Sequence, residues 1–182
     1  ASAAPKIEHS LYHVGRAQKQ ALLTLLLGDR AMSRVVVFTK TKHGAEKVGR
    51  KLQYAGVRAE TIHGNKAQNA RKKALDLFRA GKARVLVATD VAARGLDVDG
   101  ISHVINFDLP MEPEAYVHRI GRTGRAGATG IAISFCDNEE KGLLKQIERL
   151  TKTRVPTKAL PTIDAAMLAS VAASSDAVRA TD

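Results

Sequence analysis

Residues 84–97 read Arg-Val-Leu-Val-Ala-Thr-Asp-Val-Ala-Ala-Arg-Gly-Leu-Asp, and this segment is the clearest indication of the fold class. The apolar run at 85–88 contains no polar alternation, which is typical of a strand buried on both faces. Thr89 and Asp90 follow it directly. Ligands of open parallel α/β sheets bind at the carboxyl ends of the strands. The stretch therefore predicts a buried parallel strand that carries polar side chains to a binding edge.

Similar apolar runs alternate with helical patterns over most of the chain. Strand–helix alternation predicts βαβ units with right-handed crossovers, and so an α/β fold with a mostly parallel sheet flanked by helices. Strands are predicted at residues 34–38, 57–62, 84–88, 103–107 and 130–135, with an added edge strand at 7–14. Helices are predicted at residues 17–27, 43–55, 67–80 and 138–150, the last of them capped by Asn138.

The length and composition indicate one domain followed by a tail. The chain has 182 residues, of which 45% are hydrophobic, and this is enough to build a core. We place the domain at residues 1–155 and the tail at 156–182, which is rich in Ala and lacks aromatic residues. Ile163, Met167 and Val171 are four residues apart, so we expect either a flexible end or a short amphipathic helix. Such a tail could dock a protein partner or a second copy of the chain.

The charge and the residue counts favour some partners and exclude others. The net charge of +11 predicts polyanionic partners, nucleic acid before membrane. Cys136 is the only cysteine, which excludes an intrachain disulfide, and it is predicted to be a small buried hydrophobe. His9 and His13 have no obvious further ligands, so no metal site is predicted. No apolar stretch reaches membrane-spanning length and no signal peptide is visible, so we expect a cytoplasmic location.

A second informative segment, residues 118–125, reads His-Arg-Ile-Gly-Arg-Thr-Gly-Arg. Its arginines, Arg119, Arg122 and Arg125, are spaced by three, so a helical or turn-like path could present them together. The guanidinium group keeps its charge and offers a fork of donors that fits phosphate oxygens. The segment therefore predicts several guanidinium groups that converge on a polyphosphate. A basic surface turn is the alternative.

Four segments, in this order and spacing, resemble the motifs of the DEAD-box ATP-dependent RNA helicases, of the bacterial type. Residues 88–97, with Ala-Thr-Asp and Arg-Gly-Leu-Asp, and residues 118–125 resemble motifs V and VI. Residues 35–41 resemble motif IV, and residues 68–71 resemble the Gln-x-x-Arg motif that follows His-Gly. Related helicase families usually open motif VI with Gln, so His118 favours the DEAD-box branch. The resemblance covers roughly residues 7–155.

The resemblance implies the second RecA-like lobe of such an enzyme, a three-layer sandwich. The sequence contains neither a Gly-x-x-x-x-Gly-Lys-Ser/Thr phosphate loop nor Asp-Glu-Ala-Asp. In the family, both belong to an N-terminal RecA-like lobe, which binds most of the ATP and its Mg2+. We therefore expect this lobe as a partner within the same protein. The chain alone is expected to hydrolyse ATP negligibly.

The same resemblance implies roles for residues near ATP. Arg122 and Arg125 would be arginine fingers that stabilise the charge of the transferred phosphoryl group. His118 would help to couple the two lobes. Arg94 would pair with an acidic residue of the other lobe, unless it pairs with Asp97 on a solvated face. The nucleotide would be contacted by Asp97, which would touch the ribose, and by Gly95.

RNA is the partner that the resemblance implies for the remaining motif residues. Gly64, Gln68, Arg71 and Thr89 would contact its backbone, which predicts little sequence preference and strong salt dependence. The alternatives are a simple turn at Gly64, a solvated helix charge at Arg71 and a helix N-cap at Thr89. Many family members carry Asp where this chain has Asn65, so we transfer no charge-dependent role to that position.

Two other functions compete with the helicase interpretation. A RecA-like lobe can serve as a non-catalytic RNA-binding or regulatory module that never meets ATP, and a phosphate-loop lobe upstream would distinguish the two. A dinucleotide-binding oxidoreductase would need Gly-x-Gly-x-x-Gly after its first strand, and that pattern is absent.

Overall fold

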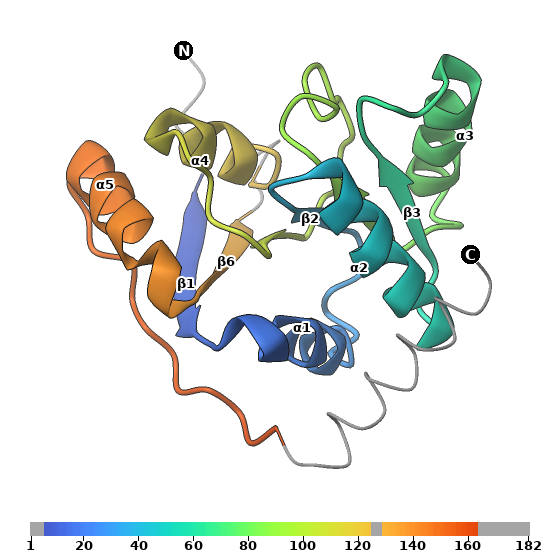
Figure 1. Ribbon diagram of the computed structural model, residues 1–182. Helices are drawn as coiled ribbons and strands as arrows, with labels where there is room; N and C mark the ends of the chain where they lie inside the picture. Colours follow the sequence, from blue (N-terminus) through green and yellow to red (C-terminus); the bar gives the residue numbers. More distant parts are fainter. Residues whose placement is uncertain (1–5, 125–128, 164–182) are drawn as a thin grey trace.

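The computed structural model describes residues 6–124 and 129–163. Six strands form one sheet in the order β1-β6-β5-β2-β4-β3, and every neighbouring pair is parallel (Figure 1). The predicted α/β class with a parallel sheet is therefore confirmed. The strands are β1 (Ile7–His13), β2 (Val35–Phe38), β3 (Ala59–Ile62), β4 (Val85–Ala88), β5 (His103–Asn106) and β6 (Gly130–Cys136).

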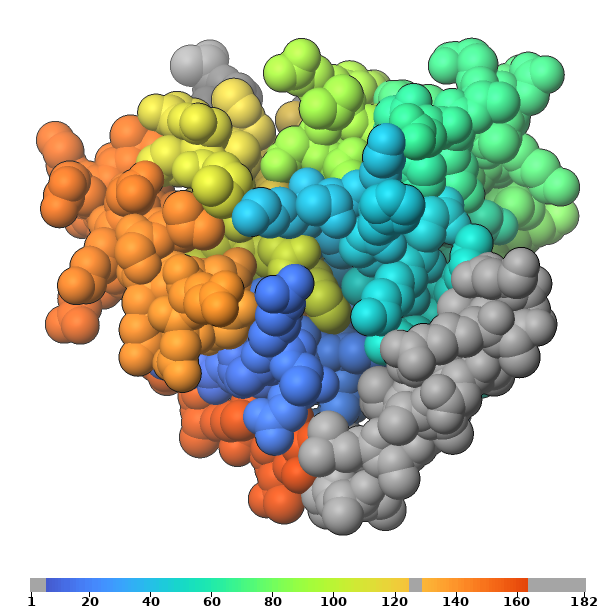
Figure 2. Space-filling view, in the orientation of Figure 1, coloured from blue at the N-terminus to red at the C-terminus, as the bar shows by residue number. Residues whose placement is uncertain are grey.

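Helices cover both faces of this sheet and complete three layers. Val35 and Val37 of β2 pack with α1 and α2, whereas Val36 and Phe38 pack in the cluster that contains α3. At β1 and β6 the second face is covered by α4 and α5, and side chains nearly hide the sheet in Figure 2. None of the helices in the described ranges is long and apolar enough to cross a membrane. The helices are α1 (Lys19–Leu26), α2 (Lys42–Tyr54), α3 (Gln68–Arg79), α4 (Pro113–Ile120) and α5 (Lys141–Thr151).

The predicted elements differ from the structure in two places. Helix α4 was not predicted as an element, although its start is typical because a proline occupies its first turn. The predicted cap at Asn138 is wrong. Asp137 caps the short 3-10 helix η2 (Asn138–Glu140), which leads into α5, and it shares a capping box with Glu140.

The start of the predicted tail lies against the edge strand. The Leu11 N–H donates to the Pro156 carbonyl at 2.8 Å, and the Lys158 N–H donates to the Leu11 carbonyl at 2.8 Å. Ile163 packs against the core. These bonds satisfy backbone groups of β1 that would otherwise lie open at the edge. The predicted helix positions Met167 and Val171 lie outside the described residues.

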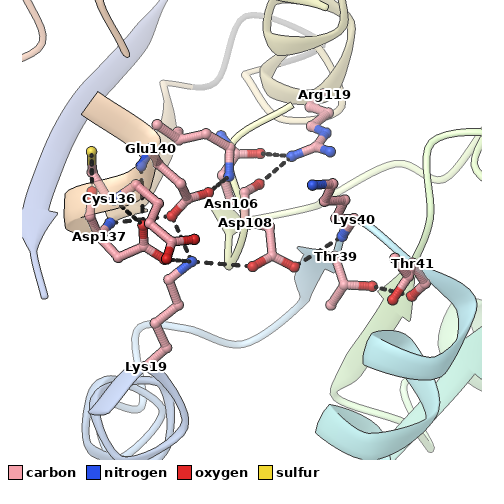
Figure 3. Close-up of polar contacts among 12 residues, drawn as sticks. Lys19, Thr39, Lys40, Thr41, Asn106, Asp108, Arg119, Cys136, Asp137 and Glu140 are labelled. Carbon is pink, nitrogen blue, oxygen red and sulfur yellow. Dashed lines mark hydrogen bonds and ion pairs between the residues drawn. The ribbon is translucent and has the colours of Figure 1, made fainter. Parts of the chain in front are cut away.

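A buried lysine ties α1 to two strand ends. The side chain of Lys19 is 2% exposed, and its ammonium group lies 2.6 Å from Glu140 Oε1, 3.1 Å from Asp108 Oδ1 and 3.6 Å from Asp137 Oδ2 (Figure 3). Burial by itself lowers the pKa of Lys19, but the hydrogen bond and charge of Glu140 and the charge of Asp108 outweigh it, so the pKa is raised. The lysine therefore remains charged and holds three carboxylates together.

Replacing this lysine tests how much the junction depends on it. Lys19→Met is expected to lower the free energy of unfolding by about 3–5 kcal/mol, because three partly buried carboxylates lose their cation. Folding raises the pKa of Lys19 above 10.5, so the charged lysine contributes its full stabilisation at neutral pH. This stabilisation is lost only as the pH rises through the pKa of Lys19 in the folded protein. Urea unfolding measures the change. Lys145→Met, at an exposed position of α5, should change it by less than about 0.5 kcal/mol; equal losses would contradict the role of Lys19.

Candidate functional site

The polar residues that follow the strands gather at one rim of the sheet. Because all strands are parallel, their carboxyl ends lie at the same edge. Thr39 follows β2, His63 follows β3 and Thr89 follows β4. Asp108 lies just beyond β5, and its Oδ2 accepts a hydrogen bond from the Lys40 N–H at 2.9 Å. The predicted rim is therefore present, and side chain to backbone bonds fix its loops to one another.

Arg119, the first arginine of the 118–125 segment, lies inside the rim rather than on it. Its residue exposure is 2%, and it forms a bidentate pair with Asp90 at 2.6 and 2.8 Å. Nη1 donates to the Asp108 carbonyl at 2.6 Å and to Asn106 Oδ1 at 3.2 Å (Figure 3). The guanidinium also stacks over the Phe38 ring at 5.1 Å. Arg119 is therefore not one of the several guanidinium groups predicted to converge on a polyphosphate, because its donors bind groups inside the protein.

Arg122 lies on the rim, anchored by part of its guanidinium. Nη1 donates to the Leu96 carbonyl at 2.8 Å, and Nε donates to the His118 carbonyl at 3.3 Å. These bonds join the end of α4 to the segment that resembles motif V, next to Gly95 and Asp97. Nη2 has no hydrogen bond among the described residues, so it can meet an anion. The second predicted finger, Arg125, lies outside the described residues.

The other residues predicted near ATP are exposed around Arg122. His118 is exposed on α4, and Arg94, Gly95 and Asp97 are exposed in or beside the turn segment 90–95. Gly95 has φ of 72°, a left-handed conformation that glycine adopts without strain. Asp97 contacts a neighbour within the chain. The structure thus brings the motif V and motif VI residues together on one open surface.

The predicted RNA residues follow β3 and β4. Gly64 is exposed in a turn, and nothing lies within 4 Å of the place where a Cβ would stand. Its φ is not in the left-handed region, so neither packing nor the backbone demands glycine there. Gln68 is exposed at the start of α3, and Arg71 Nη2 donates to the Arg94 carbonyl at 3.5 Å. A helix N-cap at Thr89 is wrong, because the residues after it form turns and not a helix.

A groove of about 790 Å3 opens beside this surface, between α1, α2 and η2. Arg16, Lys40 and Lys47 line one part of it, and Asp137 and Glu139 line another. Figure 2 shows this face, with the blue start of α1 standing between orange α5 and cyan α2. The groove is lined by none of the following residues: Gly64, Gln68, Arg71, Thr89, Gly95, Asp97 and Arg122.

The supporting roles of three residues were not predicted from the sequence. Lys19 and Arg119 are buried, and Glu46 contacts the loop after β3. A signal existed for Arg119, because it lies three residues after Tyr116 and one before Ile120, on the buried stripe of α4. Cys136, in contrast, is buried as predicted, and burial raises the pKa of its thiol to about 11.

The internal role of Arg119 predicts a large effect from a small chemical change. Arg119→Lys keeps the charge but loses the bidentate fork, so it should lower the free energy of unfolding by at least about 2 kcal/mol. Urea unfolding of the 182-residue chain measures it. Arg149→Lys, at an exposed position of α5, is the matched control and should cost less than about 0.5 kcal/mol. If Arg119→Lys unfolded at the same urea concentration as the wild type, the bidentate pair with Asp90 would not be needed for stability.

Comparison with known proteins identifies the family. The chain matches the model of the helicase conserved C-terminal domain over residues 17–127. It is 45% identical over 163 residues to the DEAD-box ATP-dependent RNA helicase CshA of Geobacillus kaustophilus, covering 90% of this chain and 35% of that protein. The chain therefore spans about a third of this curated relative's length.

Two solved structures agree with this match. E. coli DEAD-box protein SrmB, bound to the regulator of ribonuclease activity RraA, has a TM-score of 0.82 at 36% identity, over 86% of this chain and 92% of that one. S. cerevisiae Dbp5, bound to RNA and ADP BeF3, has a TM-score of 0.81 at 31% identity, over 92% of this chain and 46% of that one. The chain thus belongs to the helicase conserved C-terminal domain family, as a RecA-like C-terminal lobe of the DEAD-box type.

Proposed function

We propose that this lobe works in a longer ATP-dependent RNA helicase, where it completes the ATP site and binds the RNA backbone. The proposal rests on the way Arg122 is held. Its Nε and Nη1 donate to two carbonyls, whereas its Nη2 has no hydrogen bond among the described residues. An arginine held in this way presents charge without first having to be ordered. The Dbp5 structure that superposes on the chain holds RNA and ADP BeF3.

The arginines supply the chemistry that ATP hydrolysis needs from a second lobe. Bound ATP would bring a γ-phosphoryl group whose oxygens carry the negative charge of the transition state. Arg122, together with Arg125, would neutralise that charge. Mg2+ and most of the nucleotide would be bound by an N-terminal lobe with a phosphate loop, a motif that this sequence lacks.

The exposed residues around Arg122 would form the surface that meets that lobe. Asp97 and Gly95 would contact the nucleotide, and Arg94 and His118 would contact the other lobe. All four are exposed, as an interlobe surface requires when the lobes are apart. The site is therefore proposed to be complete only when the two lobes close.

RNA would lie across the turn after β3, the start of α3 and the end of β4. Open space above Gly64 allows a phosphate to approach the main chain, and Arg71 supplies a charge beside it. Gln68 and Thr89 would add neutral hydrogen bonds. We also propose that residues 1–155 form the domain and that the tail, 156–182, begins with the segment that pairs with β1.

The arginine-finger role predicts loss of turnover without loss of stability. In the full-length protein, Arg122→Ala should reduce ATP turnover about 1,000-fold or more, because the transition-state charge loses its partner. In the 182-residue chain, Arg122→Ala should change the thermal midpoint and the RNA affinity little. Arg119→Lys, in contrast, should lower the thermal midpoint. RNA-stimulated phosphate release measures turnover. Full turnover by Arg122→Ala would remove the finger role from this residue.

Backbone recognition predicts a uniform loss of affinity. Arg71→Ala should weaken RNA binding about equally for oligonucleotides of different sequence, and the salt slope of log K should fall by about 1. Fluorescence anisotropy at several salt concentrations measures both quantities. Lys145→Ala, on exposed α5, is the control and should bind like the wild type. A loss confined to one RNA sequence would contradict backbone recognition.

A further inference from the structure

The turn after β3 is held by a carboxylate from a different element. Glu46 lies on α2, and its Oε1 is 2.8 Å from His63 Nε2. Thr61 Oγ1 donates to the same oxygen at 3.1 Å, and Lys66 Nζ lies 3.2 Å from it. Arg50 Nε is farther away, 3.9 Å from Oε2. One carboxylate thus contacts Thr61 near the end of β3 and both ends of the turn that carries Gly64.

The ring of His63 is fixed in one orientation by contacts on both nitrogens. The Asn65 N–H donates to Nδ1 at 3.2 Å, so Nδ1 carries no proton. Nε2 must then carry the proton and donate it to Glu46. The Lys66 N–H closes the turn by donating to the His63 carbonyl at 3.0 Å. Loss of the carboxylate would free the ring and the turn together.

Glu46 is stabilised in its charged form by this arrangement. Burial by itself raises the pKa of Glu46, but the hydrogen bond from His63 and the charge of Lys66 outweigh it, so the pKa is lowered. The His63 side chain is 9% exposed, whereas Gly64 between the two contacts is open to solvent. The Glu46 carboxylate therefore contacts the mostly buried side of the turn, and the exposed side at Gly64 remains accessible to a ligand.

We propose that Glu46 is a positioning residue for RNA binding: through His63 it fixes the turn that presents the Gly64 main chain and leads into the α3 residues Gln68 and Arg71. This inference rests on the proposed RNA-binding function of the lobe. It also explains how the chain tolerates Asn65, since the bond to His63 comes from the main chain of that residue and not from its side chain. Supporting residues of this kind commonly act by orienting groups that touch the ligand.

Simple electrostatics predicts the opposite effect, which makes the test sharp. Removing an acidic residue from a protein of net charge +11 should strengthen its attraction for RNA. Loss of positioning should instead weaken it. Glu60→Ala provides the electrostatic baseline, because Glu60 lies on β3, three residues before His63. The sign of the difference between Glu46→Ala and Glu60→Ala separates the two effects.

The experiment uses the 182-residue chain, a fluorescent 12-mer of polyuridine and anisotropy at one salt concentration. Glu46→Ala should raise the dissociation constant about five- to tenfold, whereas Glu60→Ala should leave it unchanged or lower it. Glu46→Gln should stay within about twofold of the wild type, because its amide oxygen still accepts the bond from His63 Nε2. His63→Ala breaks the same contact from the other side and should match Glu46→Ala, which covers the case in which Glu46→Ala does not fold.

Long-range 1H–15N spectra of the His63 ring test the contact between His63 Nε2 and Glu46 in the absence of RNA. The wild type and Glu46→Gln should show the Nε2–H tautomer, and Glu46→Ala should show a mixture. If the wild type binds RNA and Glu46→Ala binds like Glu60→Ala, the positioning role fails while the RNA-binding function stands. If the wild type does not bind RNA, the proposed RNA-binding function of this lobe fails, and the role of Glu46 in it fails too, even where the ring signal changes.

Discussion

The bidentate pair between Arg119 and Asp90 is the interaction on which the rim depends. It joins α4 to the residues that follow β4. The same guanidinium group donates hydrogen bonds to Asn106 at the end of β5 and to the Asp108 carbonyl just beyond it. A buried arginine requires partners for its donors, because an unpaired charge in the interior is costly. The chain meets that requirement with three residues at the ends of two strands, β4 and β5. The turn after β4, the loop after β5 and α4 are therefore fixed relative to one another before any ligand arrives.

The position of Arg122 follows from that of Arg119. The two arginines are three residues apart at the end of α4, and the Arg122 N–H donates to the Arg119 carbonyl at 3.2 Å. Because Arg119 is locked inward, the backbone after it is set, and Arg122 reaches the Leu96 carbonyl on the rim. One segment thus contains an arginine that holds the structure and an arginine that is free to meet an anion. Preorganisation of the second depends on burial of the first.

The sequence could predict the sheet because its strands are apolar runs, and runs such as 85–88 need no knowledge of their neighbours. It could predict the rim residues because they follow those runs. It could not predict the partners of Lys19, which lie 89 and 121 residues away in the chain at Asp108 and Glu140. Nor could it separate Arg119 from Arg122, since spacing alone does not show which guanidinium meets Asp90. Long-range charge pairing is a property of the folded chain.

A basic surface that binds RNA gains nothing from acidic residues beneath it unless they are neutralised. Asp90 is paired with Arg119, and Glu46 is in contact with Lys66 and with the polarised N–H of His63. Each carboxylate thereby loses most of its repulsion for phosphate, because the opposite charge lies within 3.2 Å. What remains is its ability to orient a donor. Acidic residues under the rim therefore cost little long-range attraction, and in the proposed site they would fix the groups that contact the ligand.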